Sequence, residues 1–313
     1  MRYYRIEIGG STPITYTSHP NGTFDPNSLQ VDIDIPVVPF ATPMGQAMVR
    51  VHGISLQTIS QARDLNGAPI KVYGGMQAGL PLAKPMQSGL LCEGTIFQAF
   101  GNWIGTEQTL DLIIVTDGGA TQGDPKNLVL NWTKGQVLSE AIQQTLQTAY
   151  PAYKTEINIS PNLVLTSDAS GYYQTIEQLA TSIHSLSTSI IGGSYPGVNI
   201  LLKQGVFVVY DGTSVTDPTP IDFTDLIGQP TWIDAPSIQI NTVMRADLEV
   251  GDYIKLPTTL VTTTAASLSQ ARDKSAFQGV FQIDLVRHVG SSRQPDARSW
   301  ISTFNAHPTG PAA

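Results

Sequence analysis

Two Asp-Gly steps directly follow apolar, strand-like runs, and they are the first candidates for chemistry. Asp117 follows residues 113–115, and Asp211 follows residues 206–210. Paired carboxylates from two similar halves of a chain share a proton in aspartic proteases. Those enzymes have Thr or Ser after the Asp and then Gly, whereas here Gly comes next. Because Asp-Gly is also the commonest hairpin turn signal, we interpret both steps as turns.

A second pair of carboxylates, Asp32 and Asp34, shares one face of an expected strand over residues 29–35. Two residues along a strand span about 7 Å, a separation at which glycosidases hold their carboxylates. The apolar residues of this strand occupy its other face. A half-buried strand with a polar face is therefore the simpler interpretation.

Other catalytic and ligand-binding patterns are incomplete. The glycine-rich run 118–123 lacks the Gly-Lys-Ser/Thr ending of a phosphate-binding loop. Cys92 is the single cysteine, so neither an intrachain disulfide nor a CxxC zinc site can form, and its apolar neighbours predict a buried thiol. The five histidines lack zinc-site spacing; they are His19, His52, His184, His288 and His307. We expect no catalytic residue, no cofactor and no metal, and for His184 a hydrogen-bonded structural role.

The composition is unusually poor in charge. Only 13% of the 313 residues are charged, about half the usual ~25%, and the net charge is −8. This balance disfavours tight nucleic-acid binding, which needs clustered Lys and Arg. Low charge suits either burial against partners or the uncharged surface of a secreted or viral β protein. The N-terminus does not resemble a signal peptide, and no apolar run is long enough to predict a transmembrane helix.

The pattern of apolar residues predicts a mainly β protein with a small α+β insert. Residues 1–116 contain about six alternating segments typical of a small antiparallel barrel or sandwich. Residues 117–196 contain two amphipathic helices, one starting at a capping box of Thr133 and Gln136 and ending near Tyr150, and one from residue 176. Residues 197–306 return to β structure with a long polar loop at 257–275, and 307–313 form an expected flexible tail.

One short sequence pattern occurs in both β regions. Residues 64–72 read DLNGAPIKV, and residues 247–256 read DLEVGDYIKL. Each is followed by a glycine, at Gly89 and Gly279, that opens a further apolar stretch. Each copy describes a turn at glycine that leads into a strand, so we expect two similar domains related by pseudo-symmetry.

The second copy lies in a run that resembles a known family. Residues 229–257, together with 3–8 and 281–300, are similar to baseplate hub proteins of contractile-tailed phages, the Mu-like group. The resemblance implies two tail-tube-like antiparallel β-barrels per chain and a homotrimer that adapts a sixfold tail tube to a threefold spike. It also implies a location in the virion tail baseplate after assembly in the host cytoplasm. The implied partners are the tail tube, spike and tape measure proteins and other baseplate subunits, with DNA passing through without specific binding.

From the residues we add two hypotheses and keep one alternative. Asp32 and Asp34 are candidates to face a lumen, where acidic and amide side chains would repel phosphates. Trp232 and Arg245 are candidate subunit-interface residues, since Trp and Arg are enriched at interface centres, although Trp232 could equally belong to the core. The alternative function is a carbohydrate-active or proteolytic β-rich enzyme.

Overall fold

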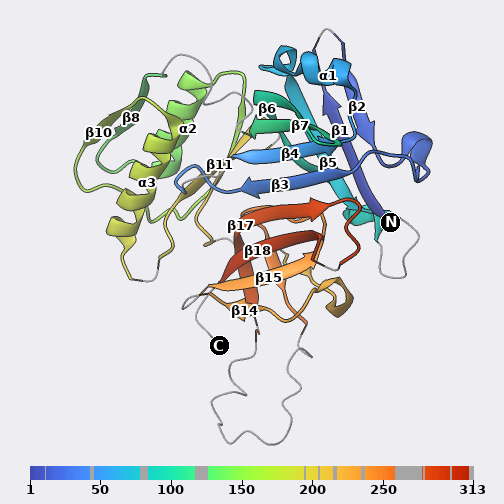
Figure 1. Cartoon of the computed structure of the whole chain (residues 1–313). Coiled ribbons are helices and arrows are strands. Elements are labelled where there is room, and N and C mark those ends of the chain that lie inside the picture. Colours follow the sequence, from blue (N-terminus) through green and yellow to red (C-terminus); the bar gives the residue numbers. More distant parts are fainter. Residues whose placement is uncertain are drawn as a thin grey trace, which may run out of the picture. The chain divides into compact units, whose positions relative to one another are not determined.

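The computed structural model describes residues 1–10, 12–42, 46–77, 84–116, 126–193, 195–203, 205–213, 217–233, 237–257, 277, 279–296 and 298–309. The chain forms two compact units. The β unit comprises Met1–Val37, Gln46–Thr116 and Thr216–Ala313, and the insert unit comprises Val38–Gly45 and Asp117–Val215. Figure 1 shows the elements of each unit.

The first half of the β unit is an antiparallel module that we call module 1. Its order is β3-β4-β7-β6-β5-β1-β2. The strands are β1 (Arg2–Ile8), β2 (Ile14–Thr17), β3 (Val31–Val37), β4 (Ala47–His52), β5 (Pro69–Met76), β6 (Gly89–Ile104) and β7 (Glu107–Val115). Short helices join them: η1 (Pro20–Gly22), α1 (Leu56–Ser60), η2 (Ala62–Leu65) and η3 (Pro85–Gln87). Alternation decides the inward face, because Ile6, Ile35 and Val49 are fully buried while their strand neighbours are not.

The second half is module 2, which follows β14-β15-β18-β17, with β17 also pairing β16 and β16 pairing β13. Its elements are β13 (Thr219–Pro220), η4 (Phe223–Asp225), β14 (Thr231–Trp232), β15 (Ile238–Val243), β16 (Tyr253–Lys255), β17 (Val280–Ser291) and β18 (Trp300–Pro308). The chain from β13 to β14 passes from the edge of β16 to the edge of β15. Leu226 bridges Thr242 on the way, so this segment closes the curled sheet into a barrel.

The two modules repeat each other in topology. Module 1 is ordered β3-β4-β7-β6-β5-β1, and module 2 is ordered β14-β15-β18-β17-β16-β13, with strands taken from equivalent places in the chain. The pairing differs only at the last strand, since β1 is antiparallel to β5 while β13 is parallel to β16. This confirms the expected mainly β fold with two related antiparallel barrels.

The repeated sequence pattern makes the same hydrogen bonds in both modules. Gly67 N donates to Ile96 O at 2.8 Å, and Gly251 N donates to Ile283 O at 2.8 Å. Ile96 N and Ile283 N donate back to the residue after each glycine, each at 2.9 Å. Both glycines have positive φ, at 81° and 90°, a conformation that explains the residue type. A bulge follows Ile96 in β6 and Ile283 in β17.

A single strand pair joins the modules into one continuous sheet. The first residues of β17 pair with β16, and Val286–Ser291 pair with β3 of module 1. One edge of β17 therefore pairs with β18 along its length, while its other edge pairs first with β16 of its own module and then with β3 of the neighbouring module. The joint is reinforced by Trp300, which packs in the module 1 core and donates to Gly75 O at 2.8 Å.

The insert unit has two helices and two small sheets around its own core. β8 (Leu128–Trp132) pairs with β10 (Ala169–Tyr173). The hairpin of β11 (Asn199–Lys203) and β12 (Val206–Tyr210) pairs with β9 (Lys154–Asn158). The apolar faces of α2 (Leu138–Ala149) and α3 (Ile176–Ile191) lie in this core. Neither helix, nor any other in the described part of the chain, is long and apolar enough to cross a membrane.

Three sequence expectations need correction. The hairpin over 199–210 belongs to the insert, not to the second barrel, because β12 pairs in parallel with β9; the insert reaches Val215. Helix α2 begins at Leu138, since Thr133 and Gln136 close a turn instead of capping a helix. His307 and Pro308 are part of β18, not of a flexible tail. The loop expected at 257–275 lies, apart from Pro257, outside the described residues.

Candidate functional site

The outward face of β3 carries the two candidate lumen residues. The alternation of β3 turns Ile33 and Ile35 into the module 1 core and leaves Asp32 and Asp34 on the opposite face. In the register, Asp32 lies opposite Arg50 of β4, and Asp34 lies opposite Val289 of β17. This face therefore crosses the joint between the two modules.

Both aspartates on this face have partners. Asp34 accepts two hydrogen bonds from Arg287, from Nε at 2.8 Å and from Nη2 at 2.6 Å. Asp32 Oδ2 lies 2.7 Å from His52 Nε2. Burial by itself raises the pKa of Asp32, but hydrogen bonds from Ser291, His52 and Gln30 together outweigh it and leave this pKa below its ordinary value.

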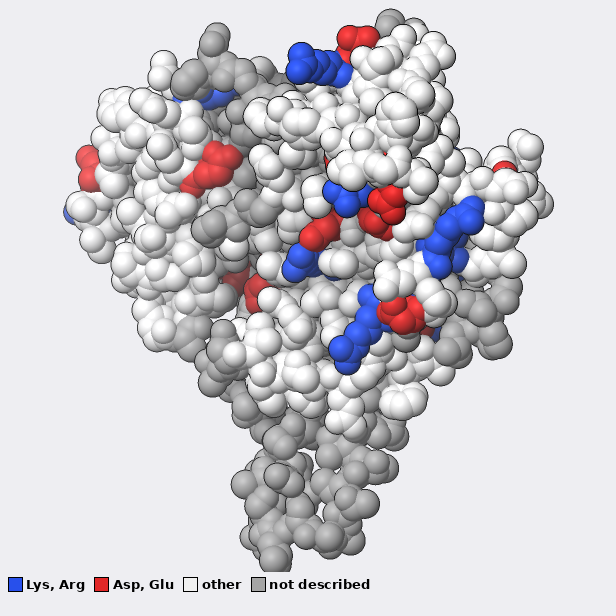
Figure 2. All heavy atoms as spheres, viewed as in Figure 1, with Lys and Arg blue, Asp and Glu red and all other residues white. Residues whose placement is uncertain are grey.

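A third pair extends the face into module 1. Arg50 Nε donates to Asp111 Oδ1 at 2.5 Å, and Asn102 Nδ2 donates to Asp111 Oδ2 at 2.8 Å. Figure 2 shows charged side chains in small groups of mixed sign on a largely uncharged surface. The face is thus polar and nearly charge-balanced rather than uniformly acidic, and the lumen position of Asp32 and Asp34 stays a prediction.

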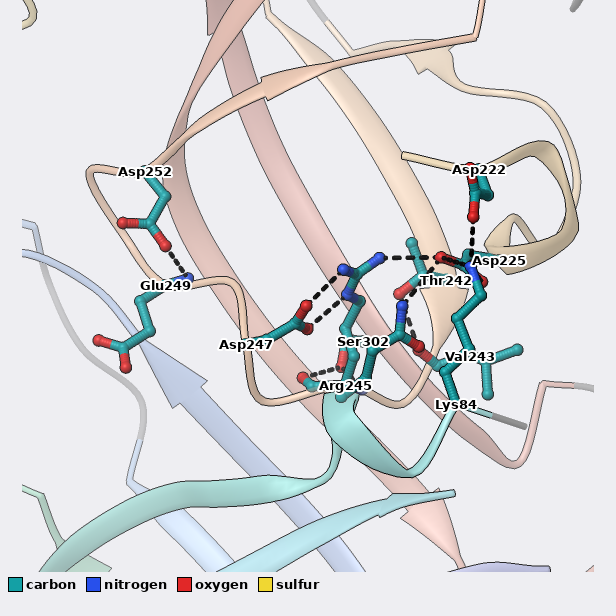
Figure 3. Close-up of polar contacts among 11 residues, drawn as sticks. Lys84, Asp222, Asp225, Thr242, Val243, Arg245, Asp247, Glu249, Asp252 and Ser302 are labelled. Atoms are coloured by element: carbon teal, nitrogen blue, oxygen red, sulfur yellow. Dashed lines mark hydrogen bonds and ion pairs between the residues drawn. The ribbon is translucent and has the colours of Figure 1, made fainter. Parts of the chain in front are cut away.

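Arg245 lies inside module 2, within a network of charges (Figure 3). Its guanidinium donates to Asp247 from Nε at 2.7 Å and from Nη2 at 2.6 Å, and to Asp225 from Nη1 at 3.2 Å. Lys84, from the β5–β6 connection of module 1, pairs with Asp225 at 3.0 Å and with Asp222. Its hydrogen bond to Asp222 is the main reason that the pKa of Lys84 is raised.

The network connects the two modules across the β unit. The Arg245 side chain is 3% exposed, and its guanidinium is paired with carboxylates of the same chain. We therefore assign it an internal structural role and do not propose it as a subunit-interface residue. Trp232 differs: it lies on β14, is 49% exposed, and stacks on Phe277 with ring centroids 5.5 Å apart.

A row of exposed apolar residues on β6 was missed by the sequence reasoning. Phe97, Phe100, Trp103 and Ile104 are 58%, 41%, 62% and 77% exposed. A signal was present, since the apolar stretch after Gly89 is longer than a half-buried strand needs, but it was interpreted only as a strand that follows the repeated pattern. Beyond Thr95, no described strand pairs with β6 on the edge away from β7.

The residues considered for catalysis are not brought together among the described residues. Asp211 is buried and accepts from Ser160 N at 2.6 Å and from Tyr195 Oη at 2.7 Å, which is a structural use. Burial, followed by this carboxylate, raises the pKa of Tyr195. Asp117 and the run 118–123 lie outside the described residues.

The remaining residues weighed for chemistry also have local structural contacts. His184 Nδ1 lies 3.2 Å from Val198 O, and His288 Nδ1 lies 2.8 Å from Ser302 Oγ. Cys92 is buried as expected, and burial raises the pKa of its thiol to about 12. In the described part of the chain, no three His, Cys, Asp or Glu side chains gather as a metal site would need.

Comparison with solved structures shows the fold of tail proteins. The chain is similar to a tail protein from Neisseria meningitidis MC58 (12% identity, TM-score 0.52, covering 98% of this chain and 96% of that one). It is also similar to the 43 kDa tail protein of prophage MuSo2 from Shewanella oneidensis (7% identity, TM-score 0.55, covering 98% and 97%). A third similar structure is the E. coli c3393 protein, a type VI secretion component described as similar to the T4 tail proteins gp27 and gp5 (10% identity, TM-score 0.51, covering 91% and 74%).

Sequence comparison adds no assignment. No family model matches the chain, and no curated protein matches it. At these identities the structural likeness defines the fold, while the activity and partners of the chain have to be argued from its own features.

Proposed function

We propose that this chain is a structural baseplate hub of a contractile tail. Three copies form a ring that adapts the sixfold tail tube above to the threefold spike below. The observation that carries the proposal is the internal repeat: each chain holds two barrels of the same strand order, joined edge to edge through β17 and β3. Three such chains offer six equivalent barrels, which matches a sixfold partner on one side and a threefold partner on the other.

The polar face supports a conduit for DNA. Its carboxylates are held by Arg50, Arg287 and His52, and the chain as a whole carries a net charge of −8. A wall without an excess of cations does not bind phosphates tightly, so DNA passes without stalling. In this proposal Asp32 and Asp34 face the lumen of the ring.

The proposed role is not enzymatic. The structural neighbours above are described as tail proteins or secretion-system components, and the buried carboxylate Asp211 is used by hydrogen bonds inside the insert. A carbohydrate-active or proteolytic function has no specific observation in its favour among the described residues. The proposed partners are the chain itself, the tail tube protein, the spike, the tape measure protein and other baseplate subunits.

Mass photometry of the purified chain tests the proposal, alone and after mixing with the tube and spike proteins of the same tail. We expect a particle of three chains that joins both partners, and electron-microscopic class averages with six similar lobes around an open centre. A particle that stays monomeric alone and with both partners would contradict the hub function.

A further inference from the structure

The two modules also contain the strands for a second joint equivalent to β17–β3, but in the described part of the chain these two strands do not pair with each other. Module 1 supplies β3 to the joint, and its equivalent in module 2 is β14. Module 2 supplies the second half of β17, and its equivalent in module 1 is the second half of β6. In the described part of the chain, β14 ends the strand order, and beyond Thr95 no described strand pairs with β6 on the edge away from β7. The first part of this edge bonds the preceding turn, since Ile96 exchanges hydrogen bonds with Gly67 and Ala68, and Ala99 N donates to Asn66 Oδ1 at 2.8 Å.

The bulges give the residue equivalence between β6 and β17. Counting from Ile96 and Ile283, Phe100 is equivalent to Arg287 and Asn102 to Val289. The partner strands agree, since Phe100 pairs with Asp111 of β7 and Arg287 pairs with Thr303 of β18.

The same procedure relates β3 to β14. Arg50 of β4 pairs with Asp111, and Asn241 of β15 pairs with Thr303, so β4 and β15 are in equivalent register. Their neighbours Met48 and Gln239 are then equivalent. Asp34 lies opposite Met48, and Thr231 lies opposite Gln239, which makes Thr231 the counterpart of Asp34.

We propose that the second half of β6 pairs antiparallel with β14 of a second copy of this chain, which repeats between chains the joint that β17 and β3 make within one. The inference rests on the hub function proposed above and names the surfaces through which the copies meet. The register of the internal β17–β3 joint predicts the register of β6 and β14 between copies. Val289 lies opposite Asp34, so Asn102 faces Thr231 of the next copy; Arg287 lies opposite Pro36, so Phe100 faces Ile233.

The exposed side chains on the two edges fit this pairing. Phe100 is 41% exposed, and Trp232 and Ile233 are 49% and 47% exposed. Apolar residues beside an open strand edge are an aggregation hazard unless a partner covers them. Helix α1 contacts both β6 and β7 and therefore packs on the face of these strands, whereas η2 contacts β6 beside the bond between Ala99 N and Asn66 Oδ1. The contacts proposed here, at Phe100 and Asn102, lie beyond that bond. Each copy has one edge of each kind, so the contact is heterologous and can close a ring.

Disulfide trapping tests the register. Asn102→Cys and Thr231→Cys are introduced together into the full chain, where Cys92 is buried. Residues directly opposite in antiparallel strands have Cα atoms about 4.5–5.5 Å apart, within the range that a disulfide spans. After mild oxidation, we expect non-reducing gels to show products of two and three chains, and a mixture of the two single variants to give the two-chain product only.

Two matched pairs serve as controls. Asp34→Cys with Val289→Cys, the internal counterpart, should oxidise without changing the chain mass. Gln98→Cys with Thr231→Cys, displaced along β6 on the same face, should not link chains. Trimers by mass photometry without the Asn102–Thr231 product would overturn this edge pairing but leave the hub function standing. Monomers with both tube and spike present, and no product, would overturn both.

Discussion

At the scale of single residues, Arg245 and His288 show how the β unit uses buried polar groups. Arg245 balances two carboxylates, and Ser302 connects the neighbourhood, since it donates to Arg245 O at 3.1 Å and contacts His288 Nδ1. Buried groups of this kind are costly when one partner is lost. Through Asp225, the Arg245 network holds module 2 to Lys84 in the β5–β6 connection of module 1.

Replacing Arg245 with Met should destabilise the chain by about 3 kcal/mol, because Asp225 stays buried with only part of its compensation. The lowered urea midpoint at pH 7, followed by tryptophan fluorescence, measures this loss. Arg63→Met is the matched control, since Arg63 is exposed on η2 and should change stability by less than about 0.5 kcal/mol. Equal midpoints for the two variants would show that the network contributes little.

His288 should make stability depend on pH. Burial lowers its pKa from 6.5 to about 4, so between these values the unfolded chain binds a proton that the folded chain does not. Stability therefore rises from pH 4 to 6.5, and this residue accounts for about 3 kcal/mol at most. Urea midpoints measured across this range for the natural chain and for His288→Gln should converge at low pH; parallel curves would refute this assignment.

At the scale of elements, the glycine turn and the bulge after it are what the two modules share. Each turn feeds a strand, β5 or β16, and each bulge redirects β6 or β17 after it has paired with that strand. The redirected half is then free to leave its own barrel. In β17 it meets β3, and this is how one chain joins two barrels.

Gly67→Ala and Gly251→Ala should each cost about 1–2 kcal/mol, because φ is 81° and 90° at these positions. Chemical denaturation of both variants tests whether the repeated turns are energetically equivalent as well as geometrically alike. Gly89→Ala is a control with an ordinary φ, and its added Cβ would lie 3.3 Å from Ala246 Cβ. A control as costly as the two turn variants would point to crowding rather than to backbone conformation.

Charges at the proposed edges should separate assembly from folding. Phe100→Asp or Ile233→Asp should abolish trimers by mass photometry while leaving the thermal midpoint nearly unchanged, because both side chains are largely exposed in the single chain. Tyr172→Asp, at a position 80% exposed on the insert, should leave assembly intact. A trimer that persists in both edge variants would contradict the edge assignment.

At the scale of the whole molecule, the chain comprises a double-barrel β unit and an insert unit, most of which comes between the two barrels in the sequence. The continuous sheet presents a polar face on which the aspartates form Asp–Arg and Asp–His pairs, whereas the sequence hypothesis had considered acidic and amide side chains alone. In each pair the carboxylate neutralises a basic side chain that could otherwise bind a DNA phosphate. The conduit hypothesis therefore depends on these pairs remaining intact.

Removing the carboxylates should therefore create affinity for DNA. In Asp32→Asn with Asp34→Asn, Arg287 loses its partner, and the assembled particle should bind duplex DNA more tightly than the natural chain at low salt. The logarithm of affinity should fall with the logarithm of salt concentration with a slope of about −1 per new phosphate contact. Fluorescence anisotropy at several salt concentrations measures both, and unchanged binding would mean that this face does not meet DNA.

Much of the β unit could be predicted because its signals are local. The alternation of residues 29–35 predicts which side chains of β3 are buried, and the repeated glycine pattern predicts two similar domains. The hairpin over 199–210 could also be predicted, but not the sheet that it joins, since a two-stranded unit with apolar faces can pair with either neighbour. The capping signature at Thr133 was misleading because the same contact also closes a simple turn.

The amino-acid sequence by itself determined strand periodicity, the duplicated turn and the low charge of this protein, because each depends on residues close together in the chain. Tertiary structure alone decided that Arg245 is buried, that Asp34 meets Arg287 and that no described strand pairs with the outer edge of β6 beyond Thr95. These outcomes depend on strand pairs between distant residues, which are selected by the packing of the whole β unit.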